Sequence, residues 1–441
     1  MITAKIFAGK TYGVYGLART GTSVVAALTA SGATVLAWDD GEAARTAFGG
    51  ATTDLHQADL RTLDALIVSP GVPHAAPLFV KATAAKIPVI GDIELFALAR
   101  PELPPHKVVG ITGTNGKSTT TALIHHILEQ AGVPTTMGGN IGLPILSQEA
   151  LPEGGVYVLE LSSFQLDLTF SLVSEVAVLL NITPDHLDRH GTVEAYAAAK
   201  ARLFAMQVPE DDAVIAMDDR LACNIAEMVV AHLVPASASR IVEEGVSVGG
   251  GVAYVDGLAI GRQSDWPDLQ GPHNAQNAAA AIAACRSLGL DNDVILSGLA
   301  SYKGLPHRME RVATVSGVTY VNDSKATNPT STAPALAAYP HIHWIAGGRA
   351  KTDELDACAP FFGHVRAAYL IGEAMPVFAG VLEGQVPVVQ AGTLAEAVAQ
   401  AHRAAVSGEV VLLSPACASY DQFKDYEARG DAFRALVGGL E

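Results

Sequence analysis

Strand-like and helix-like segments alternate along the whole chain of 441 residues, and this alternation is the feature that most constrains the fold. Short apolar runs such as 33–40, ATVLAWDD, and 107–112, KVVGIT, are each followed by a longer stretch of helical character. Strands that alternate with helices favour parallel pairing, so we expect an α/β architecture with mostly parallel sheets. A chain of this length has room for about three domains.

Two segments indicate where these domains meet. Residues 100–107, RPELPPHK, contain three prolines and have the composition of a linker. A second boundary is expected near YKGLPHRME, which begins at residue 302. The simplest organisation is therefore three consecutive α/β units, at 1–100, 101–304 and 305–441.

Composition excludes several classes of function. The 28 Lys and Arg residues against 45 Asp and Glu give a formal charge of −17, which argues against binding to nucleic acids or acidic membranes. The four cysteines are far apart, so neither a zinc site nor a disulfide framework is expected. The N-terminus lacks the apolar core of a signal peptide, and the longest uncharged run, 326–348, contains three prolines. We expect a soluble cytoplasmic protein. If its ligands are anions, local positive groups must capture them against the negative overall charge.

A glycine-rich stretch, GITGTNGKSTT at 110–120, lies between a predicted strand and a predicted helix. Gly113 and Gly116 allow the backbone to turn tightly, which brings N–H groups close to phosphate oxygens. The helix that follows adds its dipole and its unpaired N–H donors. Lys117 would place a positive charge against the outer phosphates. The stretch therefore predicts a phosphate-binding loop.

Two further observations bear on this loop. Ser118 or Thr119 can offer a hydroxyl to magnesium. The common P-loop pattern requires glycine at position 111, where this chain has Ile111. The alternative is a glycine turn that only begins a helix and leaves its lysine exposed.

The loop resembles the ATP loop of the Mur ligase family, which also includes folylpolyglutamate synthases. That family's pattern is T-G-T-N-G-K-[ST]-[ST] and needs no glycine at 111. The resemblance implies an N-terminal Rossmann-like domain, a central P-loop ATPase-like domain with a mostly parallel sheet, and a C-terminal Rossmann-like domain. It also implies that the loop binds ATP through Gly113, Thr114, Asn115, Gly116, Lys117, Ser118 and Thr119.

A carboxylate and an imidazole follow two predicted strands of the central unit. Glu160 lies near the end of YVLELSSFQL and His186 just past EVAVLLNIT. Ligands gather at the C-terminal ends of parallel strands, so this pair could hold magnesium against a phosphoryl group. Either residue alone could equally be structural, and Lys200 on an alanine-rich helix has no evident role by itself. The family resemblance implies magnesium bound by Ser118, Glu160, His186 and a Lys200 that is carbamylated by CO2.

The N-terminal stretch GLARTG, at 16–21, resembles a dinucleotide fingerprint but has alanine in place of the second glycine. Two aspartates follow at the end of the next predicted strand, where an acid that binds ribose would lie. An NAD-dependent oxidoreductase is therefore an alternative. The family resemblance instead implies contacts to a uridine-diphosphate sugar by Arg19, Thr20, Asp39, Asp40, Ser69, Gly71, Asn140 and Ser162.

The C-terminal part carries further family motifs. They imply that Asn277, Arg308, Asp323 and Lys325 complete the ATP site. Residues 412–430, with a strand, a loop and a helix expected to begin at Ser419, resemble the segment by which glutamate-adding members bind the amino acid. The D-N-P-R motif of members that add diamino acids is absent, and Tyr426 stands where the family has phenylalanine. The implied glutamate contacts are Thr327, Lys351, Ser419, Tyr420 and Tyr426.

The implied reaction joins D-glutamate to UDP-N-acetylmuramoyl-L-alanine through an acyl phosphate, with ATP and Mg²⁺, in peptidoglycan precursor synthesis. We expect a monomer that acts on small molecules without nucleic acid or membrane partners. A folylpolyglutamate synthase and a nucleotide switch that only hydrolyses ATP are further alternatives. The implied catalytic residues are Lys117, Glu160, His186, Lys200 and Arg308.

Overall fold

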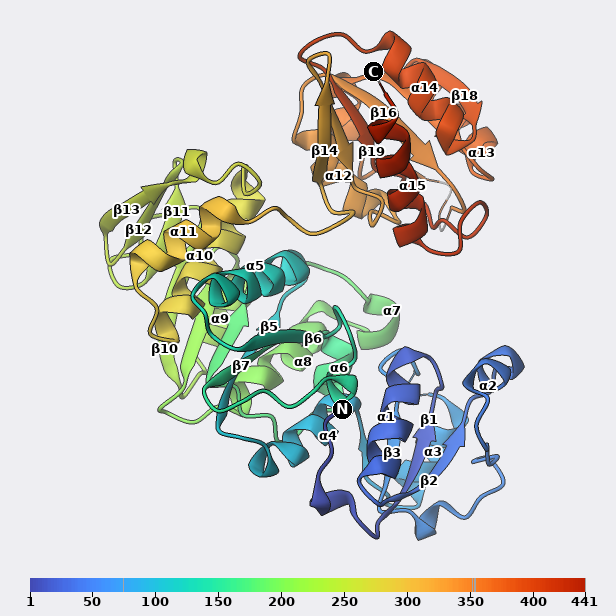
Figure 1. Cartoon of the computed structure of the whole chain (residues 1–441), viewed down its shortest axis with the longest axis vertical. Helices are drawn as coiled ribbons and strands as arrows, with labels where there is room; N and C mark the ends of the chain where they lie inside the picture. Colours follow the sequence, from blue (N-terminus) through green and yellow to red (C-terminus); the bar gives the residue numbers. More distant parts are fainter. Residues whose placement is uncertain (74, 351, 353, 441) are drawn as a thin grey trace. The chain divides into compact units, whose positions relative to one another are not determined.

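The computed structural model describes residues 1–73, 75–350, 352 and 354–440, and it has an α/β fold with three mostly parallel sheets (Figure 1). The chain forms two compact units, Met1–Tyr302 and Lys303–Glu441. The first unit contains two of the sheets and the second unit contains the third. No helix in the described part of the chain is both long and apolar enough to cross a bilayer.

The N-terminal sheet has four parallel strands in the order β2-β1-β3-β4. Its strands are β1 (Thr11–Tyr15), β2 (Thr34–Trp38), β3 (Ala65–Val68) and β4 (Val89–Ile90), with helices α1 (Arg19–Ala30), α2 (Glu42–Phe48) and α3 (Pro77–Ala84). The residues of β1 and β3 are almost all buried, as expected for parallel strands covered on both faces.

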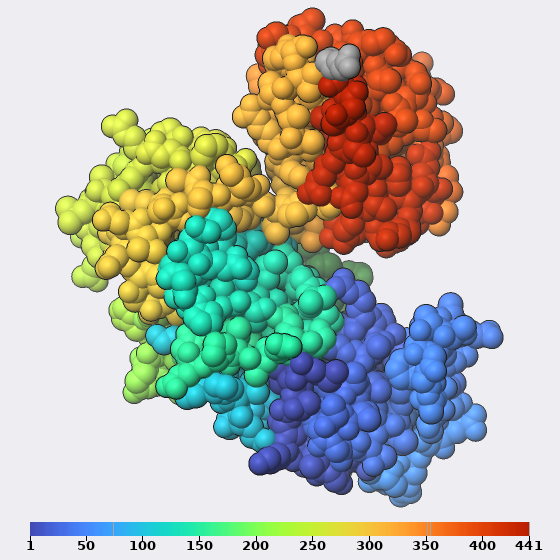
Figure 2. Space-filling model, in the orientation of Figure 1, coloured from blue at the N-terminus to red at the C-terminus, as the bar shows by residue number. Residues whose placement is uncertain are grey.

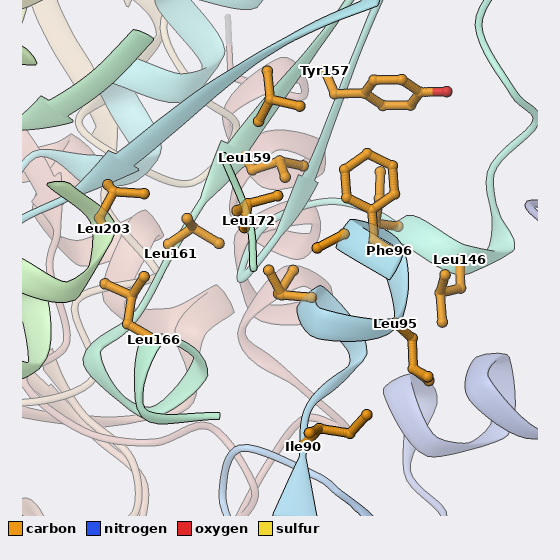
Figure 3. Close-up of a cluster of buried hydrophobic side chains, with 14 of the residues drawn as sticks. Ile90, Leu95, Phe96, Leu146, Tyr157, Leu159, Leu161, Leu166, Leu172 and Leu203 are labelled. Carbon is orange, nitrogen blue, oxygen red and sulfur yellow. The ribbon is translucent and has the colours of Figure 1, made fainter. Parts of the chain in front are cut away.

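Helix α4 (Asp92–Ala99) joins the N-terminal sheet to the hydrophobic core of the next one. Phe96 packs edge-on against Tyr157 with ring centroids 5.0 Å apart, as Figure 3 shows. The residues coloured blue and those coloured cyan to green form one continuous surface in Figure 2. The linker is shorter than expected because His106 already belongs to β5. Arg100 is ion-paired with Glu175 at 2.8 Å, which fixes the chain there.

The central sheet has nine strands in the order β13-β12-β11-β10-β9-β8-β5-β7-β6, and only the pairs β11–β12 and β12–β13 are antiparallel. The strands are β5 (His106–Thr112), β6 (Thr135–Gly139), β7 (Gly155–Glu160), β8 (Val176–Leu179), β9 (Asp212–Ala216), β10 (His232–Ser237), β11 (Val246–Gly249), β12 (Val252–Val255) and β13 (Leu258–Arg262). The helices are α5 (Lys117–Gln130), α6 (Ser163–Asp167), α7 (Leu187–His190), α8 (Val193–Ala205), α9 (Arg220–Ala226), α10 (Pro272–Ser287) and α11 (Asn292–Ser301). Helix α10 is rich in alanine, and its small side chains let it pack closely against α5 and β11.

The C-terminal sheet has the order β14-β15-β19-β16-β17-β18 and is parallel except for β14–β15. Its elements are β14 (Glu310–Val315), β15 (Val318–Asn322), β16 (Ile342–Gly347), β17 (Val365–Ile371), β18 (Val388–Gly392), β19 (Val410–Leu413), α12 (Pro329–Ala337), α13 (Met375–Leu382), α14 (Leu394–Ala404) and α15 (Tyr426–Gly438). The buried side chains of Trp344 and Ile345 alternate on β16 and belong to two different hydrophobic clusters, so both faces of the sheet are covered.

The helix expected to begin at Ser419 is a wrong prediction. The next helix, α15, begins at Tyr426, and its N-cap is Asp425, whose carboxylate accepts from Ala428 N at 2.7 Å. The carboxylate of Asp421 accepts from Glu373 N at 3.0 Å, which ties the preceding segment to the end of β17 as a loop. Helix α14, in contrast, has Thr393 as its N-cap, and the side chain of Thr393 accepts from Glu396 N.

Candidate active site

The glycine-rich loop joins β5 to α5, the structural context that a phosphate loop requires. Gly113 and Gly116 have φ values of +148° and +84°, in a region that L-residues rarely adopt. A Cβ built on Gly116 would lie 2.2 Å from the side-chain oxygen of Asn277, so α10 also requires a glycine there. Gly116 is the N-cap of α5 and no side chain caps this helix end. A helix N-terminus without a side-chain cap is a favourable place for an anion.

Asn181, at the end of β8, holds the loop in shape. Its side-chain oxygen accepts from Asn115 N at 2.8 Å, and its amide nitrogen donates to Asn115 O at 3.2 Å and to Gln276 Oε1 at 2.8 Å. Its carbonyl also accepts from Thr114 N at 2.8 Å. Our sequence analysis gave this residue no role. The only signal was a polar residue directly after an apolar strand.

Lys117 lies over the loop that it follows. Its Nζ donates to the carbonyls of Gly113 at 2.9 Å and Thr114 at 2.8 Å. Ser118 is buried in the first turn of α5, and Thr119 is half-buried beside it. The structure thus brings an ammonium group and two hydroxyl-bearing residues together at one helix N-terminus.

Glu160 is the last residue of β7 and is 2% exposed. Its Oε1 accepts from the amide of Asn140 at 3.1 Å. Its Oε2 is buried and has no hydrogen-bond partner among the described residues. A buried carboxylate oxygen without a donor is costly, so this atom is well suited to a cation.

Lys200, on α8, is 1% exposed and close to the same loop. Its Nζ donates to Gly113 O at 2.8 Å and lies 4.4 Å from the ring centroid of Tyr196. Burial is the largest cause that lowers the pKa of Lys200 well below its ordinary value, and the positive charge of Lys117 adds to it. The carboxylates of Asp185 and Glu160 have the opposite effect. This shift favours the neutral amine more than at an exposed lysine.

His186 begins α7 with a left-handed backbone, φ +51°, and its half-exposed ring lies 4.9 Å from that of Phe164. Its Nε2 is 3.5 Å from a carboxylate oxygen of Asp185. Within the described ranges, no group of three or more His, Cys, Asp and Glu side chains is arranged to hold a metal ion. The magnesium set predicted from the family resemblance contains only two residues of these types, Glu160 and His186.

The predicted nucleotide-sugar residues lie on loops after β1, β2 and β3, and several already hold those loops. Asp39 accepts from Leu17 N at 2.7 Å and from Gly41 N at 2.8 Å. Asp40 accepts from Tyr15, Trp38 and His56 side chains at 2.5, 3.0 and 2.8 Å. Ser69 donates to Gly16 O at 3.2 Å.

The other members of this predicted set connect the two sheets of the first unit or lie beside them. Arg19 donates to Gly142 O at 3.2 Å, and Thr20 follows it in the first turn of α1. Ser162 is the N-cap of α6 in a capping box with Gln165, so its hydroxyl has a structural role. Gly71 has open space around its Cα, since a Cβ built there meets no atom within 4 Å.

In the second unit, Asp323 follows β15 and is almost fully buried. Burial raises the pKa of Asp323 to about 7, although its bonds from Ser414 Oγ and Met309 N and the charge of Arg308 oppose the shift. The Nζ of Lys325 lies 5.4 Å from the ring centroid of Tyr426.

The residues predicted to contact glutamate lie in the same unit. Ser419 is buried and Tyr420 is exposed, both in the loop before α15, and Thr327 directly precedes the N-cap of α12. Burial and a hydrogen bond with Glu427 raise the pKa of Tyr426 to about 12. Lys351 lies outside the described residues.

Comparison with known proteins identifies the family. Family models match at residues 10–91 (Mur ligase MurD-like, N-terminal domain), 111–285 (Mur ligase middle domain) and 307–417 (Mur ligase, glutamate ligase domain). A UDP-N-acetylmuramoylalanine–D-glutamate ligase of Novosphingobium aromaticivorans is 57% identical, over 100% of this chain and 97% of that protein. The chain belongs to the Mur ligase family. A ligase of the same name from Sphingopyxis alaskensis is 58% identical over the full length of both chains.

Solved structures of other Mur ligases share the fold. The UDP-N-acetylmuramate-alanine ligase of Thermotoga maritima gives a TM-score of 0.60 at 19% identity, over 98% of this chain and 100% of that one. A UDP-N-acetylmuramoylalanyl-D-glutamyl-2,6-diaminopimelate–D-alanyl-D-alanyl ligase of Acinetobacter baumannii gives 0.58 at 18% identity, over 99% and 92%. The α/β fold predicted from the sequence is therefore confirmed. As a Mur ligase, the chain is an ATP-dependent ligase, which removes the basis for the oxidoreductase alternative.

Proposed function

We propose that this Mur ligase joins D-glutamate to UDP-N-acetylmuramoyl-L-alanine at the expense of ATP, as a cytoplasmic step of peptidoglycan precursor synthesis. Relatives at 52–58% identity over the whole chain, which are named as this ligase, support the choice of substrates. The observation that carries the chemistry is the cluster of Lys117, Lys200 and Glu160 around the glycine-rich loop. Such a cluster suits phosphoryl transfer, where charge must be neutralised as it moves.

The reaction begins with transfer of the γ-phosphoryl group of ATP to the alanine carboxylate. A carboxylate is a poor electrophile, and the acyl phosphate gives it a good leaving group. The neutral amine of D-glutamate then attacks the carbonyl carbon, and phosphate leaves from the tetrahedral intermediate. Lys117 stabilises negative charge on the transferred group, and the N–H groups of the loop and α5 orient the phosphates.

We propose that Ser118, Glu160, His186 and carbamylated Lys200 hold magnesium. When bound, this ion supplies positive charge that orients and polarises phosphate oxygens. The orphan Oε2 of Glu160 and the buried amine of Lys200 support the assignment. An unmodified lysine amine is no hard oxygen ligand, whereas its carbamate offers oxygen atoms. The neutral form that burial favours is also the form that can add CO2.

We also propose that Asn277, Arg308, Asp323 and Lys325 contact ATP and that Thr327, Lys351, Ser419, Tyr420 and Tyr426 contact glutamate. The domain limits 1–100, 101–304 and 305–441 and a monomeric state are proposed on the same basis.

One assay tests this function against the alternatives. Phosphate release is measured with ATP, Mg²⁺ and UDP-N-acetylmuramoyl-L-alanine, with and without D-glutamate, and with L-glutamate as the control. We expect release only with D-glutamate. Release that needs no amino acid would indicate a nucleotide switch and refute the ligase. Release with a folate acceptor in place of the nucleotide sugar would favour a folylpolyglutamate synthase.

A further inference from the structure

Arg189, on the short helix α7, connects two segments of the first unit. Its Nη1 donates to the carbonyl of Pro70 at 3.0 Å, in the loop that follows β3. Its guanidinium carbon lies 4.2 Å from the ring centroid of Phe164 on α6. Pro70 stands between Ser69 and Gly71, which belong to the predicted nucleotide-sugar set, and His186 begins the same helix. Arg189 therefore lies where the substrate loop meets the proposed metal-binding segment.

The other two nitrogen atoms of this guanidinium indicate a ligand-binding site. Nε and Nη2 of Arg189 are both buried, and neither has a hydrogen-bond partner among the described residues. These two N–H groups form one edge of the planar group, which matches the two oxygens of a carboxylate or phosphate. The same edge is filled in Arg61, where it grips both oxygens of Asp59 at 2.9 and 2.8 Å. Burial of an unfilled edge is costly, so an acceptor is expected.

We propose that the Nε–Nη2 edge of Arg189 binds an oxyanion of the nucleotide-sugar substrate, either a phosphate of its diphosphate or the carboxylate of its alanine. This inference rests on the function proposed above. The two donors lie next to the loop that carries Ser69 and Gly71. An anion bound to Arg189 therefore also lies beside these two loop residues.

An acceptor within the protein is the competing explanation. The carboxylates of Asp167 and Asp188 raise the pKa of Arg189, although burial is the larger influence and lowers it. Neither carboxylate accepts a hydrogen bond from Arg189 in this structure. If Asp167 were the natural partner, Arg189 would be a structural residue. Removal of either charge would then have the same effect on stability and on substrate affinity.

The test uses Arg189→Lys, which keeps the charge but loses the planar edge. The matched control is Arg202→Lys, since Arg202 also lies over a phenylalanine ring, but its Nε and Nη2 donate to the carbonyls of Leu166 and Thr169. Binding of UDP-N-acetylmuramoyl-L-alanine, UDP-N-acetylglucosamine and ATP is measured by calorimetry on the full-length proteins. Arg189→Gln replaces the lysine variant if thermal unfolding shows that the latter does not fold.

We expect Arg189→Lys to bind UDP-N-acetylmuramoyl-L-alanine at least tenfold more weakly, with ATP affinity within twofold of the wild type. The Arg202 control should bind both ligands as the wild type does. Weaker binding of UDP-N-acetylglucosamine as well identifies the diphosphate as the bound group, and its unchanged binding identifies the carboxylate.

Three results would overturn the inference. The first is unchanged affinity of Arg189→Lys for the alanyl substrate. The second is equal loss of affinity for this substrate and for ATP, which indicates a structural role. The third is an Asp167→Asn variant that weakens substrate binding as much as Arg189→Lys does. A wild type that binds no nucleotide sugar would instead refute the proposed function, together with the inference that rests on it.

Discussion

Replacement of Gly116 by alanine tests whether the loop geometry is required for nucleotide binding. The new Cβ would lie 2.2 Å from the side-chain oxygen of Asn277, far inside van der Waals contact. Asn277 is 3% exposed and is held on both sides: its oxygen accepts from Thr120 at 3.3 Å and its nitrogen donates to Asn274 at 3.1 Å. The amide therefore cannot yield without loss of these bonds.

The expected loss of stability has two parts. A left-handed backbone, φ +84° here, costs an L-residue about 1–2 kcal/mol. Loss of the bond between Thr120 and Asn277 adds about 1 kcal/mol, so the total is about 2–3 kcal/mol. Gly132, at the other end of α5, is a matched control, because it has φ +73° and a Cβ there meets no atom within 4 Å. Only the backbone cost applies to Gly132→Ala.

Both variants are compared with the wild type by urea unfolding and by titration with ATP. Gly116→Ala should be the less stable of the two and should bind ATP at least tenfold more weakly, because Asn277 and the loop N–H groups are displaced together. Gly132→Ala should keep its ATP affinity within twofold. If the two variants unfold alike and bind ATP alike, the collision with Asn277 has no consequence and the reasoning is wrong.

Three further predictions concern charged groups. Lys117→Ala should reduce kcat/KM by at least about a hundredfold, because each charge-assisted hydrogen bond contributes about 1.5–3 kcal/mol; turnover near the wild-type rate, with an unchanged circular dichroism spectrum, would contradict its role. Lys200→Ala should lose most activity and recover part of it with acetate, whereas Lys117→Ala should not; full activity without acetate would mean that no carbamate is needed. Asp323 has a pKa raised to about 7 by burial, above the unfolded value of about 3.9. Its contribution to stability should therefore be present at pH 4 and be lost as the pH rises to 7. Urea unfolding at pH 5 and 8 should show a smaller difference for Asp323→Asn than for the wild type, and an equal difference would refute this.

The sequence predicted those parts of the site that depend on local chain geometry. The strand–loop–helix around Lys117 follows from two glycines and a change of periodicity, and the structure has it at the expected residues. The polar ends of β7 and β8 were also expected, and Glu160 and Asn181 lie there. The hydrogen bonds from Asn181 to Asn115 could not be predicted, because they depend on the pairing of β5 with β8.

The wrong helix start at Ser419 also arises from a contact between segments that are far apart in the sequence. Ser419 and Asp425 are both good helix caps, and sequence alone cannot choose between them. The choice is made by Asp421, whose bond from Glu373 N holds residues 419–425 against another strand end. The hydrogen bonds that Asp39 and Asp40 accept from Leu17 N and Tyr15 within their own domain could not be predicted either. Their substrate contacts remain a prediction.

Lys117 and Lys200 contact the same carbonyl of the loop, and this shared contact bears on the proposed carbamylation of Lys200. The Nζ atoms of Lys117 and Lys200 both donate to the carbonyl of Gly113, at 2.9 and 2.8 Å. Two ammonium groups so close would repel each other, and burial together with the charge of Lys117 lowers the pKa of Lys200 well below its ordinary value. This shift favours the neutral amine, the form that adds CO2 with release of a proton, and the proposed carbamate would carry a negative charge beside Lys117. The proposed carbamylation would thus give an attraction to Lys117 where a protonated Lys200 would be repelled.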